Sequence, residues 1–228
     1  MPRNCNNISL TGLDQPNACR NNRSGVKTIY VCPMADVTAV NAVPNQNPTN
    51  PAEFVTIGSA NLGAQAIECK EGKGFVKIFC ANNMGELKYT AQGEIIGCRS
   101  QLAQLDIFHP GFSRDALGFL HYANNCPMVI VAKLNNGEYH LLGDQDEGAI
   151  IASGNEATSG KDKGDNNGIN PVLEYNCGRQ QIFWEGFDPA DATNGIPILS
   201  ATSADTERDP VVVDPNADPD PNADPNAD

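Results

Sequence analysis

Side chains suited to acid–base or nucleophilic chemistry are few in this 228-residue chain and lie far apart in the sequence. Its three histidines are His109, His121 and His140, and no two of them have a spacing that would place them together on one element. We expect His121 to be a boundary residue on a predicted helix and His140 to lie in solvent, so neither is assigned a role as a base. The chain contains no nucleophile elbow, phosphate-binding loop or dinucleotide fingerprint. The sequence therefore predicts no catalytic residue, no cofactor-binding residue and no cofactor, and we expect the protein not to be an enzyme.

Two loops collect carboxylate and amide oxygens, which are the ligands that Ca²⁺ prefers. They comprise Asp144, Asp146 and Glu147 in one loop, and Asp162, Asp165, Asn166 and Asn167 in the other. Neither loop matches the alternating ligand spacing of a known calcium loop, and the second loop has no bidentate glutamate. We interpret both loops as turns and predict no metal site.

The eight cysteines raise the question of disulfides or bound zinc. They include no Cys-x-x-Cys pair, so we predict no zinc site. Four of them lie in or beside strand-like runs: Cys32, Cys69, Cys80 and Cys98. A free cysteine in such a run packs as a small apolar residue, and the chain begins with a polar segment that lacks the apolar core of a signal peptide. We therefore expect a soluble protein made in the cytoplasm with buried thiols; disulfides stay open as an alternative, above all for Cys5 and Cys19.

Composition and charge narrow the class of protein. The chain has 21 glycines and 16 prolines, with 40% apolar and 19% charged residues, which favours many turns and little long helix. The formal net charge of −13, with no cluster of lysine and arginine, argues against a tight grip on nucleic acid. No window approaches the run of about 18 apolar residues that a membrane helix needs, so no membrane partner is expected.

The segment between Gly25 and Gly97 has the pattern of a β-rich meander. Strands are expected over residues 26–32, 54–58, 66–70, 75–80 and 86–97, with a loop over 41–51. Glycine and asparagine at the breaks supply turn conformations that other residues resist. Later strands are expected over residues 149–152 and 172–177, and a last one over 182–184 contains the only tryptophan.

Two helices are predicted between these groups of strands. Residues 100–108 have apolar side chains at every third position, at Leu102, Leu105 and Phe108. The second helix begins after Ser113 as its N-cap and ends at Asn124–Asn125, before Pro127. Both are expected to pack an apolar stripe on the sheet.

A β-hairpin around Asn136–Gly137 is the strongest local prediction in the sequence. Asparagine and glycine tolerate the positive φ values of a two-residue type I′ turn. That turn would place Leu134 opposite Tyr139, with Lys133 and His140 together on a solvent-facing side.

The chain is predicted to consist of three parts. Residues 1–24 are a polar arm, residues 25–200 a β-rich domain, and residues 201–228 an acidic tail with repeated Asp-Pro-Asn-Ala. Residues 204–228 contain eight acidic residues and one arginine, and proline prevents a regular helix there. We expect that removing this tail leaves the domain folded.

The order of elements from Leu117 to Tyr175 resembles the tail tube and related structural proteins of tailed bacteriophages, especially those that infect Bacteroidetes. The resemblance depends on a helix, a strand, the Asn136–Gly137 turn, Leu141–Leu142–Gly143, the loop at residues 158–160 and residues 165–168 before another strand. It covers about a quarter of the chain.

This resemblance implies a β-sandwich or barrel flanked by one or two helices, with an extended N-terminal arm and C-terminal tail. It implies a homo-oligomer, a ring or helical tube assembled in the host cytoplasm and incorporated in the virion with other tail proteins. DNA would pass through the tube without specific binding, and no residue would be catalytic.

An extracellular β-sandwich adhesin or surface-filament subunit is the alternative. In that protein the cysteines would be bridged and the acidic tail would act as a spacer. The state of the thiols distinguishes the two hypotheses.

Overall fold

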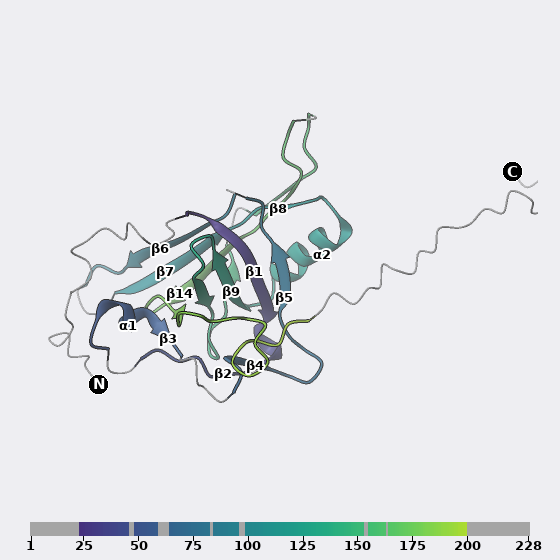
Figure 1. Ribbon diagram of the computed structural model, residues 1–228. Helices are drawn as coiled ribbons and strands as arrows, with labels where there is room; N and C mark the ends of the chain where they lie inside the picture. Colours follow the sequence, from purple (N-terminus) through teal and green to yellow (C-terminus); the bar gives the residue numbers. More distant parts are fainter. Residues whose placement is uncertain are drawn as a thin grey trace, which may run out of the picture.

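The computed structural model describes residues 23–45, 48–58, 64–82, 84–95, 99–152, 155–162 and 164–199. These residues form a mainly β fold, a sandwich of two larger sheets with two small sheets and a helix around it (Figure 1). Most of the predicted arm, residues 1–24, and all of the predicted tail, residues 201–228, lie outside the described residues.

The larger sheet has six strands, and its spatial order differs from the sequence order. Across the sheet they are β3 (Thr56–Ile57), β15 (Ile182–Phe183), β10 (Tyr139–Leu142), β9 (Met128–Leu134), β1 (Val26–Pro33) and β5 (Val76–Phe79). All neighbours are antiparallel except β15 and β3, which are parallel. The first described strand, β1, therefore lies between two strands that come much later in the chain.

The second larger sheet has four antiparallel strands. In spatial order they are β11 (Ile150–Ile151), β14 (Val172–Cys177), β7 (Ser100–Asp106) and β6 (Glu86–Gln92). Two small sheets complete the fold, with β2 (Val37–Val40) paired to β4 (Ile67–Cys69), and β12 (Glu156–Thr158), β13 (Gly168–Asn170) and β8 (His109–Pro110) in a row. The segment that contains β12 projects beyond β8 (Figure 1).

The central strands are buried on both faces because the six-stranded sheet lies between two apolar cores. In β1, Ile29 and Val31 face one core, and Tyr30 and Cys32 face the other. This alternation follows from the two-residue period of side chains along a strand. It explains why β1, β9 and β10 are near-continuous apolar runs.

The first core fills the space between the two larger sheets. Leu105 from β7 and Leu173 from β14 pack there with Ile130 and Leu142 of the six-stranded sheet, and all four are almost completely buried. The second core lies on the opposite face, under β4 and residues 184–199. There the rings of Phe183 and Phe187 stack with centroids 3.9 Å apart.

The predicted second helix is confirmed as α2 (Arg114–Ala123). The Ser113 hydroxyl accepts a hydrogen bond from the backbone N–H of Ala116 at 3.1 Å, as an N-cap does. A short helix, α1 (Pro51–Val55), and a 3₁₀ turn, η2 (Met34–Asp36), are the other helical segments in the described ranges. The prediction of a strand over residues 54–58 was wrong at its start, because Asn50 caps α1 by accepting from Glu53 N–H.

The prediction of a helix over residues 100–108 was wrong, because this segment contains β7. The side chains that face the core are those of Ala103, Leu105 and Ile107, which have a period of two. Leu102 and Leu105 gave the appearance of a three-residue period, and Ala103 was too small to stand out as a core residue.

The predicted register of the hairpin between β9 and β10 was also wrong. The loop has three residues, because the Leu134 N–H donates a hydrogen bond to the Glu138 carbonyl. The Gly137 N–H donates to the Leu134 carbonyl, and Gly137 has a positive φ of +100°. Lys133 therefore pairs with Tyr139, and Ala132 pairs with His140. A one-residue change moves side chains to the opposite face, and it places His140 in the interior at 6% exposure.

The predicted meander was wrong for most of its neighbours. β4 pairs with β2, and β5 pairs with β1 rather than with β4 or β6. Among the described residues of this part of the chain, only β6 and β7 are consecutive strands that pair with each other. The sequence located β1, β4, β5 and β6 but missed β2, and most of the pairing partners are distant in the sequence.

Candidate functional site: a thiol pair and an open sheet edge

The three histidines lie in separate places, as their spacing predicted. His109 contacts the Phe79 carbonyl through Nδ1 at 2.9 Å, and His121 is exposed in the last turn of α2. His140 Nδ1 lies 2.9 Å from the hydroxyl of Tyr89, inside the sandwich. Burial raises the pKa of that Tyr89 hydroxyl above its usual range, so the hydroxyl keeps its proton in this contact.

The oxygen-rich loops use their carboxylates to hold their own turns. Asp144 Oδ1 accepts from the backbone N–H groups of Asp146 and Glu147, and its Oδ2 accepts from the Tyr175 hydroxyl at 2.8 Å. Asp165 Oδ2 likewise accepts two backbone N–H groups in the other loop, and these bonds lower its pKa. In the part of the chain that the structure describes, no three metal-ligating side chains converge on one point.

A hollow of about 350 Å³ lies beside β7 and the small sheet of β8, β12 and β13. Asp106, Glu156, Thr158 and Asn170 contribute to its lining. Burial, with a smaller contribution from Glu86, raises the pKa of Asp106. Met84 and Phe108 add apolar surface to these carboxyl, amide and hydroxyl groups, and the lining contains no cysteine or histidine.

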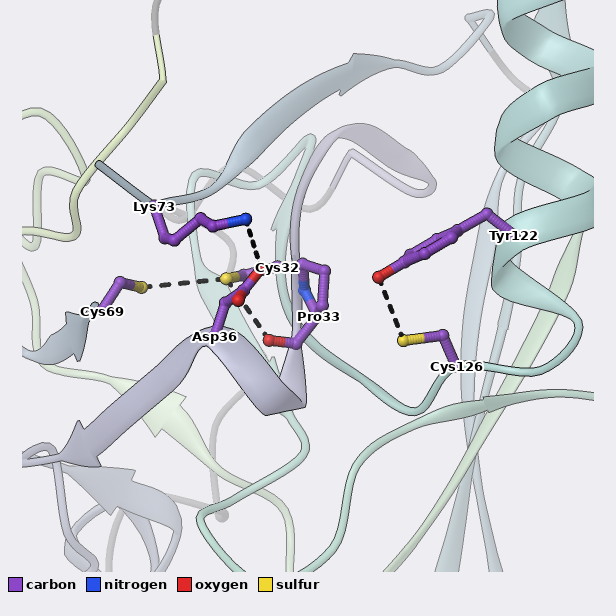
Figure 2. A network of polar contacts seen from close by, with 7 residues as sticks. All are labelled: Cys32, Pro33, Asp36, Cys69, Lys73, Tyr122 and Cys126. Atoms are coloured by element: carbon purple, nitrogen blue, oxygen red, sulfur yellow. Dashed lines mark hydrogen bonds and ion pairs between the residues drawn. The ribbon is translucent and has the colours of Figure 1, made fainter. Parts of the chain in front are cut away.

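The most distinctive chemical group is a pair of thiols between two layers of the fold (Figure 2). Cys32 Sγ and Cys69 Sγ lie 3.8 Å apart, although 37 positions separate them in the sequence. The turn η2 brings this about, because it leads the chain from β1 into β2, and β2 pairs with β4 so that Val37 lies opposite Cys69. Cys69 is thereby placed over the end of β1.

The two thiols differ in exposure and in acidity. Cys32 is completely buried and Cys69 is partly exposed. The thiol–thiol hydrogen bond, together with burial, raises the pKa of Cys32, and the same bond lowers the pKa of Cys69. Cys69 is therefore the sulfur that ionises first.

Charged and polar groups surround this pair. An ion pair joins Lys73 Nζ and Asp36 Oδ2 at 3.6 Å beside the sulfurs, and Cys126 contacts the Tyr122 hydroxyl on the far side of Pro33 (Figure 2). The expectation of buried thiols is correct for Cys32 and Cys80, whereas Cys69 is only partly covered. Cys5, Cys19 and Cys98 lie outside the described residues. The pairing itself was missed, since no sequence spacing indicates that β4 crosses β1.

The second feature is the free edge of the four-stranded sheet. β6 has seven residues and pairs with β7 on one side, and no described strand pairs with its other side. The Ile107 N–H donates to the Pro171 carbonyl, on the β14 side of β7. Alternate residues along β7 therefore direct their backbone N–H and C=O groups to β14 and to β6. By that alternation Leu87, Tyr89 and Ala91 direct their backbone groups away from β7.

The surface next to this edge is partly apolar. Ile95, three residues beyond the end of β6, is 71% exposed. An unpaired strand edge is a template for pairing with another chain. The β6 edge is therefore a candidate interface.

Comparisons with known proteins found no match, so the function is inferred from the fold and from these two features. No protein-family model, curated protein or solved structure matches the chain. No helix in the described ranges is long and apolar enough to cross a membrane.

Proposed function

We propose that this protein is a structural protein of a tailed-phage virion. Its subunits assemble into rings that stack as a tail tube, which serves as a conduit for DNA. It contacts copies of itself and other tail proteins, and it is assembled in the host cytoplasm.

The observation that carries this proposal is the open edge of β6. A strand from a second subunit can add to the seven-residue edge through main-chain hydrogen bonds, and the exposed Ile95 beside it offers an apolar contact. Repetition of this pairing around a closed ring would join the four-stranded sheets of successive subunits.

Charge and chain pattern add support. A net charge of −13 gives a lumen that repels the DNA backbone, so a genome can slide through it without being held. The residues that carry the resemblance to tail tube proteins, 117–175, extend from α2 through β9 and β10 to β14.

Electron microscopy of the purified protein tests the proposal. Negative-stain images at raised concentration, under reducing conditions, are expected to show rings or tubes with a central channel. A protein that stays monomeric under all conditions of concentration and salt would contradict self-assembly through its own edges.

A proline in β6 tests the role of the edge. Ala91→Pro removes one outward N–H and keeps the ladder to β7, because the Ala91 N–H points away from β7. We expect a folded subunit that no longer forms rings, whereas the control Ala91→Ser keeps the N–H and assembles. Normal rings from a folded Ala91→Pro protein would remove β6 from the interface.

Deletion of the acidic tail separates folding from assembly. Leu199, the last described residue, donates its N–H to Phe75 C=O at 2.9 Å, so deletion of residues 204–228 leaves this contact intact. We expect a native circular dichroism spectrum with weakened assembly. Loss of the folded spectrum would show that the tail belongs to the domain.

A further inference from the structure

Cys32 and Cys69 have their sulfur atoms close enough to form a covalent bond after a small movement. Their sulfurs are 3.8 Å apart and point toward one another (Figure 2), and a disulfide needs an approach to about 2.05 Å. β4 belongs to a two-stranded sheet at the outside of the fold, so a small displacement of that layer brings the sulfurs together. β1 is fixed between β5 and β9 and remains in place.

The other described cysteines lack this arrangement. Cys80 and Cys177 are buried, and burial raises the pKa of the Cys80 thiol to about 12 and also raises that of Cys177. Cys126 contacts the Tyr122 hydroxyl at 3.4 Å and the Pro127 carbonyl at 3.7 Å, with no second sulfur among its contacts. Only Cys32 and Cys69, of the described cysteines, have a hydrogen bond between sulfurs.

We propose that Cys32 and Cys69 are a disulfide-forming modification site, in which Cys69 reacts first with a small-molecule disulfide and Cys32 resolves the adduct. The bond fastens the β2–β4 layer to the central strand β1. This site is independent of the β6 edge and of the tail-tube function.

The chemistry balances with oxidised glutathione as the oxidant. The Cys69 thiolate attacks one glutathione sulfur, which forms a protein–glutathione disulfide and releases one glutathione thiolate. The Cys32 thiol then loses its proton to solvent and attacks Cys69 Sγ, which releases the second glutathione thiolate. Both cysteine sulfurs are oxidised, one glutathione disulfide is reduced to two thiols, and the two protein protons are taken up by the released thiolates.

Exposure determines the order of these steps. The sulfur that meets the oxidant must be accessible and ionised, and Cys69 is partly exposed whereas Cys32 is completely buried. The buried thiol meets no glutathione directly and reacts only with the adduct beside it.

Mass spectrometry of the full-length native protein tests the site. The protein is incubated with oxidised glutathione, its remaining thiols are alkylated, and it is digested without reduction. Cys32 and Cys69 lie on one tryptic peptide between Lys27 and Lys70, and cleavage at Glu53 by a second protease separates them unless they are bridged. We expect this peptide to lack two hydrogens and to stay joined, while Cys80 and Cys177 remain free thiols.

Two single variants test the order of reaction. In Cys32→Ser the glutathione adduct is expected to accumulate on Cys69, because the resolving thiol is absent. In Cys69→Ser we expect Cys32 to stay unmodified. Circular dichroism checks that both variants are folded.

Two results would overturn the proposal. One is a native wild-type protein in which Cys32 and Cys69 stay unlinked while the same oxidant links them after unfolding. The other is glutathione on Cys32 in Cys69→Ser. Both readouts are made on the subunit itself, so a failure of assembly would leave them unaffected.

Discussion

Replacing Tyr89 with phenylalanine removes one hydroxyl from the core between the two larger sheets. In the native protein this hydroxyl lies 2.9 Å from His140 Nδ1, and the imidazole is 6% exposed. The other ring nitrogen, Nε2, has no hydrogen-bond partner among the described residues, and the Glu138 carboxylate lies 3.9 Å from it. The variant therefore leaves a buried imidazole without its hydrogen bond, which costs about 1–3 kcal/mol of unfolding free energy.

Urea unfolding, followed by circular dichroism under reducing conditions, measures this loss. With a slope of about 2 kcal/mol per molar urea, a loss of about 2 kcal/mol lowers the midpoint by about 1 M. The matched control is Tyr122→Phe, since Tyr122 is 53% exposed and its loss of a hydroxyl should change stability by less than about 0.5 kcal/mol. An unchanged midpoint for Tyr89→Phe, or an equal decrease in both variants, would refute the reasoning that the register of β10 buries a dependent histidine.

Two further changes test the cores. Leu105→Ala, in the first core, should lower the unfolding free energy by about 2–5 kcal/mol, whereas Leu117→Ala, on the exposed side of α2, should cost under about 1 kcal/mol; equal costs in urea unfolding would mean that Leu105 is not a core residue. Burial raises the pKa of Tyr89 and of Tyr175. The unfolded state therefore releases these two phenolic protons near pH 10, at a lower pH than the folded state does. Their full contribution to the free energy of unfolding is present below pH 10 and is lost as the pH rises above it. The double variant Tyr89→Phe with Tyr175→Phe should show a flatter decline in urea midpoint between about pH 9 and 11; parallel curves would show that these hydroxyls do not cause the decline.

Elements defined by local signals could be predicted from the sequence. α2 begins at a serine cap and has its apolar residues on a helical period, and both signals lie within a few residues of each other. β1, β5 and β14 were predicted because their apolar runs are bounded by turn residues. The broad class, a mainly β fold with a short helix, follows from these elements together, whereas the sandwich arrangement was expected only from the resemblance to tail tube proteins.

The errors arise where two local patterns compete or where a small residue carries the signal. Residues 100–106 fit a three-residue period through leucines, but the core selects Ala103 and Leu105 because neighbouring strands β6 and β14 satisfy the backbone of β7. Asn136–Gly137 suits loops of two or three residues, and the sequence alone gives no reason to choose. The three-residue loop shifts the strand register by one residue, so His140 lies in the interior and not in solvent.

The candidate sites depend on contacts between distant parts of the chain. Cys32 and Cys69 meet because β2 and β4 fold over β1, and that layer has no short-range signature. The β6 edge could not be recognised either, since its neighbour β7 had been predicted as a helix. Both sites required the pairing of strands, which local patterns do not specify.

The position of β1 between β5 and β9 has a consequence for the newly made chain. β1 is complete at Pro33, whereas β9 begins at Met128, and a ribosome takes about 5–20 s to add the intervening residues. During that time the strand Val26–Pro33 has apolar side chains for two cores and lacks the partner on one of its sides. Ile196 and Ile198, which help to close the second core, are synthesised later still. The subunit therefore cannot complete its fold until nearly the whole domain has been translated, and the interval in which it needs protection from aggregation is set by the rate of protein synthesis.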